Sequence, residues 1–343
     1  MFGRVRKRDR RIERLLALLS PGSRPNLNAL RDIANAIEPL TLNIKQMGYR
    51  LARDLAAALP PDRGGEPSPV ALKSSLSTQE AIASAWVAYW CGQLHIPVIY
   101  HRKIWELCYV LQSIYNADLI RQGSRGLGFG CGTEPIPSYL AAHGVFVTAT
   151  DLAPARAASR GWIKGGQHTS ANEAFLDHLV GREQFDQQVS LRSVDMNAIP
   201  TDLTGFDFCW SICALEHLGS IRNGLAFVEN SLRTLRPGGM AVHTTEFNIR
   251  DDGPTVDNWD TVAFQRKHLE ALADRLEEQG HRVAPFDFSL GEGPLDKFID
   301  LPPYNYDLPA CLDEWLGPPV HLKLTINGLV TTCAGLIIHK APA

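Results

Sequence analysis

The sequence predicts an α/β fold with a mainly parallel sheet, and residues 125–151 carry the strongest sign of it. Glycine occupies every second position from Gly126 to Gly132, and two prolines follow where a helix would begin. Proline in a first helical turn forfeits only an amide that has no helical partner. Residues 145–150 are rich in β-branched side chains, as in a buried parallel strand, and Asp151 follows them. The order of strand, glycine turn, helix and strand is typical of the first β-α-β unit of a Rossmann-like sheet.

The spacing within this unit predicts a nucleoside-bearing cofactor. Asp151 follows Gly132 by 19 residues, close to the roughly 20 expected for a carboxylate that receives a ribose hydroxyl. The dinucleotide fingerprint G-x-G-x-x-G fails in every register, because its last glycine falls on Cys131, Thr133 or Pro135. A glycine-rich turn that binds no ligand is the alternative.

Length and composition allow one large α/β domain with an additional module. The chain has 343 residues and a net charge of −3, which gives no global reason to expect nucleic acid. Its seven cysteines form no CxxC pair and no zinc spacing. With no signal peptide visible, they indicate reduced thiols in a cytoplasmic protein. No apolar run approaches the ~18 residues that span a bilayer.

Later segments extend the first unit in a fixed order. They are Gly130-Cys131-Gly132-Thr133 at the turn, Asp195-Met196 after an apolar strand, Phe206-Asp207-Phe208-Cys209-Trp210-Ser211 as a fourth strand, Leu215-Glu216-His217-Leu218 after it, and Leu235-Arg236-Pro237-Gly238-Gly239 before a fifth strand. Together they resemble the class I S-adenosylmethionine-dependent methyltransferases, of the methyltransferase type 11 and 12 kind. The resemblance covers roughly residues 122–246.

This resemblance implies a Rossmann-like sheet of seven strands, parallel except for an antiparallel C-terminal edge strand, in a methyltransferase domain at residues 122–343. It implies S-adenosylmethionine as the cofactor. The implied cofactor contacts are Gly128, Gly130, Gly132, Glu134, Asp151, Leu152, Asp195, Met196 and Ser211. Asp195 is expected to accept a hydrogen bond from the adenine amino group and Met196 to pack on the ring. A turn or cap role is the alternative for Asp195.

Two positions depart from the family's pattern. Gly128 stands where relatives commonly have an acidic residue, and Glu134 stands where they have the third glycine of the turn. Both positions concern the methionine end of the cofactor. We expect Glu134 to take over part of the missing acidic contact.

Residues 1–77 are predicted to form an N-terminal helical region with a linker. Residues 4–20 are basic and then leucine-rich, which predicts a solvated terminal helix or, alternatively, an arm for an anionic membrane surface or a partner. Residues 26–59 have helical apolar spacing, with a break or kink expected at Pro39. Residues 60–77 are rich in Pro, Gly and Ser, which indicates a linker.

Residues 78–121 are predicted to form a helical cap that leads into the core. Three basic residues from His101 precede Trp105 and Glu106 at helical spacing. In this kind of fold the helix before the first strand often covers the cofactor. We therefore assign His101, Arg102 and Trp105 to substrate binding. The alternative is a helix surface with a pair between Arg102 and Glu106.

The rest of the chain supplies the remaining elements. The predicted helices are residues 154–160, 223–235 and 263–279, and the predicted strands are residues 189–194, 206–211, 240–244, 281–290, 321–326 and 329–339. Residues 165–173 are predicted to be a flexible loop, and residues 291–319 a long lid or binding loop. Asn327-Gly328 predicts a hairpin turn between the last two strands.

For methyl transfer from a sulfonium, the protein mainly has to align the two reactants and exclude water from the site. A hydroxyl or amine acceptor must also lose a proton, and a positioned base accelerates this by about 10²–10⁴-fold. His217 lies just past the fourth strand, and His243 and Glu246 lie at the tip of the fifth, so these three are the predicted catalytic residues. For His217 the alternative is a capping role. Glu216 and Tyr304 are assigned to substrate binding, and no metal site is predicted.

The sequence thus predicts a methyltransferase acting on a hydroxyl, or less favourably an amine, of a small molecule or glycan. The alternatives are a methyltransferase for protein or another macromolecule and an S-adenosylmethionine-binding module without catalysis. A dehydrogenase is a distant fourth because the dinucleotide fingerprint fails. No nucleic-acid partner is expected. The basic N-terminus leaves peripheral membrane contact open, and the oligomeric state is open as well.

Overall fold

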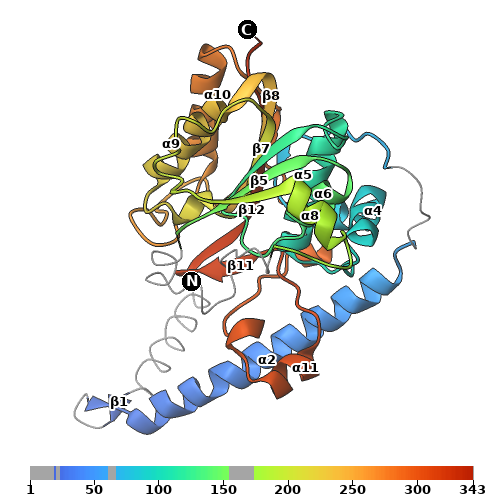
Figure 1. The fold of residues 1–343 in the computed structure, drawn as a ribbon. Coiled ribbons are helices and arrows are strands. Elements are labelled where there is room, and N and C mark those ends of the chain that lie inside the picture. The colour runs from blue at the N-terminus through green and yellow to red at the C-terminus, as the bar shows by residue number, and fades with distance from the viewer. Residues whose placement is uncertain (1–18, 21–23, 61–66, 154–173, 343) are drawn as a thin grey trace.

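A mostly parallel sheet lies between two layers of helices in the computed structural model, which describes residues 19–20, 24–60, 67–153 and 174–342 (Figure 1). Its strands are β4 (Arg125–Phe129), β5 (Phe146–Asp151), β6 (Val189–Ser193), β7 (Phe206–Ile212), β8 (Leu235–Asn248), β9 (Arg282–Val283), β11 (Leu324–Ile326) and β12 (Leu329–His339). Seven of them follow the order β11-β12-β8-β7-β4-β5-β6, and β9 pairs with β12. Strands β4 to β8 are parallel, and β12 is antiparallel to its three neighbours.

The predicted α/β class and the antiparallel C-terminal strand are confirmed, but two details differ. The sheet has eight strands within the described residues rather than seven. Strand β12 is also not the edge, because β11 pairs along its outer side. Asn327 and Gly328 have φ of 49° and 78°, the left-handed conformation that a two-residue hairpin turn requires. The hairpin predicted from Asn327-Gly328 therefore forms and covers the sheet's edge.

Helices cover both faces of the sheet. Among them are α4 (Ala85–Gln93), α5 (Arg102–Asn116), α6 (Ile136–Ala142), α9 (Ile221–Ser231) and α10 (Arg266–Glu278). One apolar core joins α4, α5 and α6 to one face, and a second core joins α9 and α10 to the other. Smaller elements are α3 (Gln79–Ile82), α8 (Arg182–Gln188), α11 (Ala310–Leu316), β1 (Leu19–Ser20), β2 (Arg24–Pro25), β3 (Ser74–Ser75), β10 (Phe286–Asp287), and the 3-10 turns Leu215–His217, Leu232–Thr234, Pro294–Asp296 and Asn305–Asp307. The arrangement is the three-layer sandwich expected of parallel strands linked by helices.

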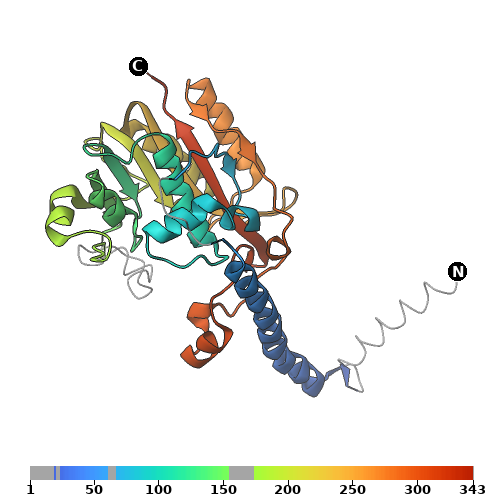
Figure 2. The same ribbon diagram turned by 90° about the vertical axis from the view of Figure 1, so that its right-hand side faces the viewer.

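A long helix, α2 (Leu27–Ala57), projects from the body (Figures 1 and 2). Asn26 caps its start by accepting a hydrogen bond from Ala29 N. Of the break or kink predicted at Pro39, the break is wrong, because the helix continues through this residue. Residues 31–40 are all exposed, so water can hydrate the carbonyl that Pro39 leaves without a donor. Only the second half of α2 buries side chains, among them Lys45 and Tyr49.

The predicted linker and three other predicted segments have different outcomes. The described part of the predicted linker, residues 67–77, packs on the domain. Ser74 N donates to Pro285 O, Ser77 N donates to Cys333 O, and Leu76 is buried. The composition of this segment does not predict the packing, because its contacts with the domain are made by backbone groups. The predicted helices at residues 4–20 and 154–160 and the predicted loop at residues 165–173 lie outside the described residues, except for Leu19 and Ser20, which form β1.

The long loop predicted at residues 291–319 is partly structured, because it contains α11 and two 3-10 turns. Helix α11 packs beside α2, so this segment fills the angle between the projecting helix and the body (Figure 1). Of the described helices, none combines the length and the apolar character needed to cross a membrane.

Candidate functional site

The glycine turn after β4 faces the end of β5. Gly130 and Gly132 have φ of 61° and 51°, a conformation that favours glycine. A Cβ at Gly130 would lie 2.9 Å from the Cβ of Ala214, so this position also has no room for a side chain. Asp151 accepts hydrogen bonds from Gly132 N at 3.3 Å and Leu152 N at 2.7 Å. These bonds fix the carboxylate of Asp151 directly across from the turn.

The turn opens into a cavity of about 710 Å³ at the carboxyl ends of the parallel strands. This is the size and place of ligand sites in open α/β sheets. The predicted site residues that line it are Gly130, Gly132, Glu134, Asp151, Leu152, Asp195, Met196, His101, Arg102, Glu216, His217, Glu246 and Tyr304. The remaining four, Gly128, Ser211, Trp105 and His243, are absent from its wall.

Asp195 and Met196 lie at the same end of the cavity as Asp151, just after β6. Asp195 Oδ1 accepts a hydrogen bond from Asn197 N at 2.9 Å, which also makes it a turn residue. Met196 is 8% exposed, and its sulfur would lie 3.6 Å from a Cβ at Gly130. The thioether of Met196 therefore borders the glycine turn at Gly130, and the carboxylate of Asp195 lines the same cavity.

Gly128 does not reach the cavity because Trp210 and Cys131 lie over it. A Cβ at this position would be 2.5 Å from the Trp210 ring and 2.3 Å from Cys131 Sγ. The indole Nε1 of Trp210 donates to Glu134 Oε1 at 2.5 Å. Trp210 therefore links the two departures from the family's pattern: its ring excludes an acid at position 128 and its N–H holds the acid at position 134. Burial raises the pKa of Glu134 to about 8.

The prediction that His243 is a catalytic base is not supported by its position. His243 is 1% exposed on the face of the sheet that packs on α9. Its Nδ1 lies 2.8 Å from Ser211 Oγ and its Nε2 lies 3.1 Å from Ser231 Oγ. Burial lowers the pKa of His243 to about 3, so it is a neutral core residue. Ser211 is committed to the same bond, which corrects its assignment as a cofactor contact.

Trp105 is also a core residue, which corrects its assignment to substrate binding. It is 1% exposed, and its ring stacks on Tyr109 with centroids 4.6 Å apart. A Cβ at Gly335 of β12 would lie 3.0 Å from this indole. The face of α5 that carries Trp105 therefore packs on the sheet, and its first turn carries Arg102 to the cavity.

Three ionisable side chains, Arg102, Glu216 and Glu246, gather where the start of α5 meets β8 and the 3-10 turn Leu215–His217. Arg102 forms an ion pair with Glu246 Oε1, and these side chains are 12% and 4% exposed. Glu246 Oε2 is buried with no hydrogen-bond partner among the described residues. Glu216 is 1% exposed and accepts from Thr245 Oγ1 at 3.2 Å. This part of the cavity is thus built to receive polar groups.

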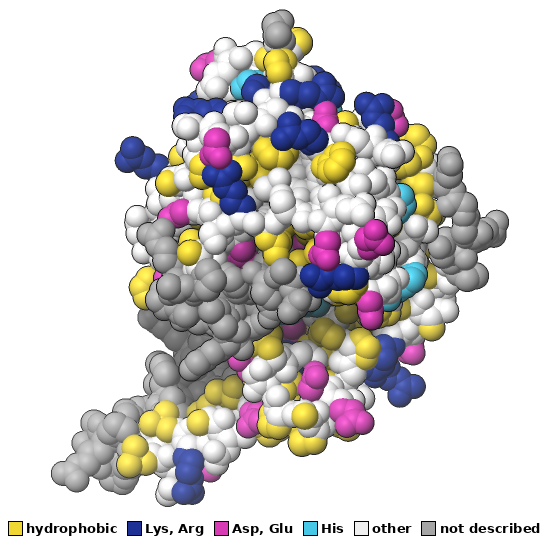
Figure 3. Space-filling model, viewed as in Figure 1, with side chains coloured by type: hydrophobic (Ala, Val, Ile, Leu, Met, Phe, Trp, Pro, Cys, Tyr) yellow, Lys and Arg dark blue, Asp and Glu magenta, His cyan; other side chains and the backbone are white. Residues whose placement is uncertain are grey.

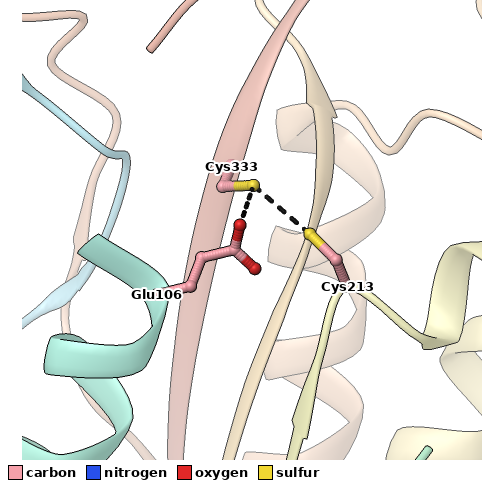
Figure 4. A group of neighbouring side chains, drawn as sticks. All are labelled: Glu106, Cys213 and Cys333. Atoms are coloured by element: carbon pink, nitrogen blue, oxygen red, sulfur yellow. Dashed lines mark hydrogen bonds between the residues drawn. The ribbon is translucent and has the colours of Figure 1, made fainter. Parts of the chain in front are cut away.

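Next to Arg102, the side chains of Glu106, Cys213 and Cys333 form a group that resembles a set of metal ligands (Figure 4). The sulfurs of Cys213 and Cys333 are 3.3 Å apart, and Cys333 Sγ donates to Glu106 Oε1 at 3.0 Å. Burial raises the pKa of both thiols, so they are protonated donors. Although burial opposes it, Lys103 and Arg102 lower the pKa of Glu106. The three groups satisfy one another without an ion, and the absence of a metal site stays a prediction.

No pattern in the sequence indicates that His321 belongs to this site. His321 lines the cavity beside His101, and the two rings stack with centroids 4.9 Å apart. Its Nδ1 lies 2.7 Å from Asp300 Oδ2, and Asp300 Oδ1 accepts from Lys45 Nζ at 2.5 Å. Lys45 and Asp300 are 255 residues apart in the chain, so only the tertiary fold shows their pairing.

The surface around the site carries charges of both signs. On the face in Figure 3, Lys and Arg side chains are interspersed with Asp and Glu, and apolar side chains gather toward the projecting helix α2. Leu30, Ile33, Ile37 and Leu40 of this helix are each more than 40% exposed. Among the described residues visible on this face, the basic side chains are mixed with acidic ones rather than gathered into a continuous track of the kind that follows a nucleic-acid backbone.

Part of the chain is similar in sequence to known proteins. Residues 127–243 match the sequence model of the methyltransferase domain family. The malonyl-[acyl-carrier protein] O-methyltransferase of Enterobacter lignolyticus is 30% identical over 125 residues, which make up 36% of this chain and 40% of that protein. The match therefore spans less than half of that relative.

Solved structures of similar fold are distant. The [4+2]-cyclase SpnF shares 18% identity with a TM-score of 0.42, over 70% of this chain and 82% of that one. An S-adenosylmethionine dependent methyltransferase from Mesorhizobium loti shares 14% identity with a TM-score of 0.36, over 66% and 98% of the two chains. Likeness at this level identifies no reaction.

Proposed function

We infer that this protein, whose residues 127–243 are a methyltransferase domain of the class I S-adenosylmethionine-dependent family, transfers a methyl group from that cofactor to a hydroxyl group of a small molecule or glycan. The observation that carries this is one continuous cavity with two chemically different ends. Asp151, Asp195 and the glycine turn lie at one end. Arg102, Glu246 and Tyr304 lie at the other.

The first end has the groups that a nucleoside and an amino-acid tail require. Asp151 would accept the ribose hydroxyls, since backbone amides already orient its carboxylate. Asp195 would accept from the adenine amino group, with Met196 against the ring. Glu134 would face the ammonium of the methionine tail. When bound, S-adenosylmethionine supplies a methyl group on a positively charged sulfur, already activated for transfer.

The second end suits a polar acceptor. Glu246 Oε2 is buried without a partner among the described residues, and Arg102 Nε is in the same state. A ligand that offers both a donor and an acceptor would satisfy the two groups, as a hydroxyl does. Tyr304 and Tyr306 line this end with aromatic surface. The relative named above is an O-methyltransferase, which also supports an oxygen acceptor.

The acceptor proton needs a base. His217 lines the cavity, with its Nδ1 3.0 Å from Asp260 O and 3.2 Å from Thr261 Oγ1. Glu246 lines it too, but its carboxylate is already engaged in the ion pair with Arg102. His217 is therefore the better of the two strand-tip candidates.

A labelled-methyl assay tests this function. Purified protein would be incubated with methyl-labelled S-adenosylmethionine and a panel of phenols, sugars, polyols and matched amines. We expect label in the hydroxylated acceptors and little in the amines. Label found only in amines, or only in added protein, would replace the proposal with the corresponding alternative. Cofactor binding with no transfer to any acceptor would favour a module without catalysis.

A further inference from the structure

His321 stands in a setting that none of the other cavity histidines shares. Its backbone is fixed to the start of α5, because His321 N donates to Tyr100 O at 2.9 Å and Arg102 N donates to His321 O at 3.2 Å. The side chain is 7% exposed and lines the cavity beside Arg102 and Tyr304. This places the imidazole at the acceptor end defined above.

The ring is held from three sides. Asp300 Oδ2 lies 2.7 Å from its Nδ1, His101 stacks on one face, and Tyr304 meets it edge-on with centroids 5.1 Å apart. Tyr304 OH in turn donates to the backbone oxygen of Thr325. An imidazole packed in this way has one orientation, which is a requirement for a group that must meet a reacting atom.

Asp300 fixes the tautomer of His321. A carboxylate only accepts hydrogen bonds, so the proton of the neutral ring belongs on Nδ1 and the lone pair on Nε2. The other oxygen of Asp300 accepts from Lys45 Nζ at 2.5 Å and from Leu301 N at 3.1 Å, which holds the carboxylate in place. Tyr49 OH adds a bond to the same carboxylate. Among the described residues, no hydrogen bond engages Nε2 of His321.

Burial, together with the nearby cations, keeps His321 neutral near pH 7. Burial lowers its pKa, the cations Arg102 and Lys45 act in the same direction, and the hydrogen bond to Asp300 opposes them. His101 stays neutral beside it, because burial holds the pKa of His101 well below its ordinary value. Tyr49 and Tyr304, the other titratable neighbours, have raised pKa values through burial and are uncharged.

We propose that His321 is the general base of the methyl transfer and that Asp300 is the residue that positions it. The proposal rests on the function inferred above. As the acceptor oxygen forms its bond to the methyl carbon, the carbon–sulfur bond breaks and its electron pair stays on sulfur. The acceptor's hydroxyl proton passes to Nε2 of His321. The imidazolium then releases the proton to solvent when the product leaves.

The first test needs no acceptor. The ring nitrogens of ¹⁵N-histidine-labelled protein would be followed by NMR, with the His321 signals assigned by their loss in His321→Asn or His321→Gln. We expect a ring protonated at Nδ1 and unprotonated at Nε2 at pH 7, with a pKa below 6.5. In Asp300→Asn the pKa of His321 should fall further, because the carboxylate that raises it is gone. A ring protonated at Nε2, or an imidazolium at pH 7, would overturn the proposal.

The second test measures turnover with the best acceptor of the labelled panel. His321→Asn should lower kcat by about 10²–10⁴-fold, while the Kd for S-adenosylhomocysteine stays within threefold of wild type. His217→Asn is the rival arm. If His217→Asn loses that activity and His321→Asn keeps it, the base is His217 and the proposal is wrong. If S-adenosylhomocysteine does not bind to the wild type, the proposed function fails, whereas the NMR result still reports on His321.

Discussion

Replacing Lys45 with methionine is expected to lower the free energy of unfolding by about 3–5 kcal/mol. Lys45 Nζ and Asp300 Oδ1 are 2.5 Å apart, and each side chain is 1% exposed. Methionine would fill much of the volume but leave the Asp300 carboxylate buried without its cation. Urea denaturation of the two proteins, followed by far-UV circular dichroism, gives the difference.

The same helix offers a matched control. Arg50 lies 3.9 Å from Asp54, and these side chains are 73% and 69% exposed. Since exposed pairs contribute about 0–1 kcal/mol, Arg50→Met should change stability little. The double variant Lys45→Met with Asp300→Asn should recover part of the loss, because it removes the buried charge as well. A Lys45→Met protein as stable as Arg50→Met would show that the buried pair does not anchor α2.

Glu134→Gln is expected to remove the pH dependence that this side chain gives to cofactor binding. The pKa of Glu134 is about 8, so the free protein holds it protonated at pH 7. An ammonium ligand favours the carboxylate, and binding then releases a proton. The affinity of the wild type should therefore rise about tenfold per pH unit toward pH 8 and level above it. At pH 8.5 the variant should bind about 10–150-fold more weakly, since it loses a charge-assisted hydrogen bond.

Comparing the wild type with Glu134→Gln separates the effect of Glu134 from that of the ligand, because the ligand's amino group titrates in the same way with both proteins. Titrations with S-adenosylhomocysteine at pH 6 and pH 8.5 give the ratio of the two affinities. Methylthioadenosine, which lacks the amino-acid tail, is the matched ligand and should bind both proteins alike. A wild-type to variant ratio that is equal at both pH values would mean that Glu134 does not meet the ammonium.

Local patterns in the sequence were enough to identify the residues at one end of the cavity, because this end is built from short segments that each follow a strand. The glycine turn, Asp151 and Asp195 each follow a strand whose composition is readable. Strand direction then brings the three together at one edge of the sheet.

The sequence did not reveal which face of a buried strand a side chain occupies. Both faces of β7 and β8 are apolar, so alternation gives no hint. Ser211 and His243 are paired in register and face α9, whereas Trp210 and Ile212 face α5. His243 therefore had the right position along its strand and the wrong face.

The acceptor end was harder still because it depends on contacts distant in sequence. Lys45, Asp300 and His321 come from α2, from the loop after β10 and from the segment before β11. Each is unremarkable in its own segment. The parallel bridges His101↔His321 and Asp300↔Leu324 bring these segments to the start of α5, and no spacing rule predicts such bridges.

The central claim is that the cavity beside Asp151 holds S-adenosylmethionine, and calorimetric titration tests it most directly. Wild-type protein would be titrated with S-adenosylmethionine and S-adenosylhomocysteine, beside Asp151→Ala, Asp151→Asn and the exposed control Asp202→Ala. We expect micromolar binding of both ligands by the wild type and by Asp202→Ala. Asp151→Ala should bind about 5–150-fold more weakly, the cost of one lost hydrogen-bonded carboxylate. Failure of both ligands to bind, or equal affinity in Asp151→Ala, would contradict the account.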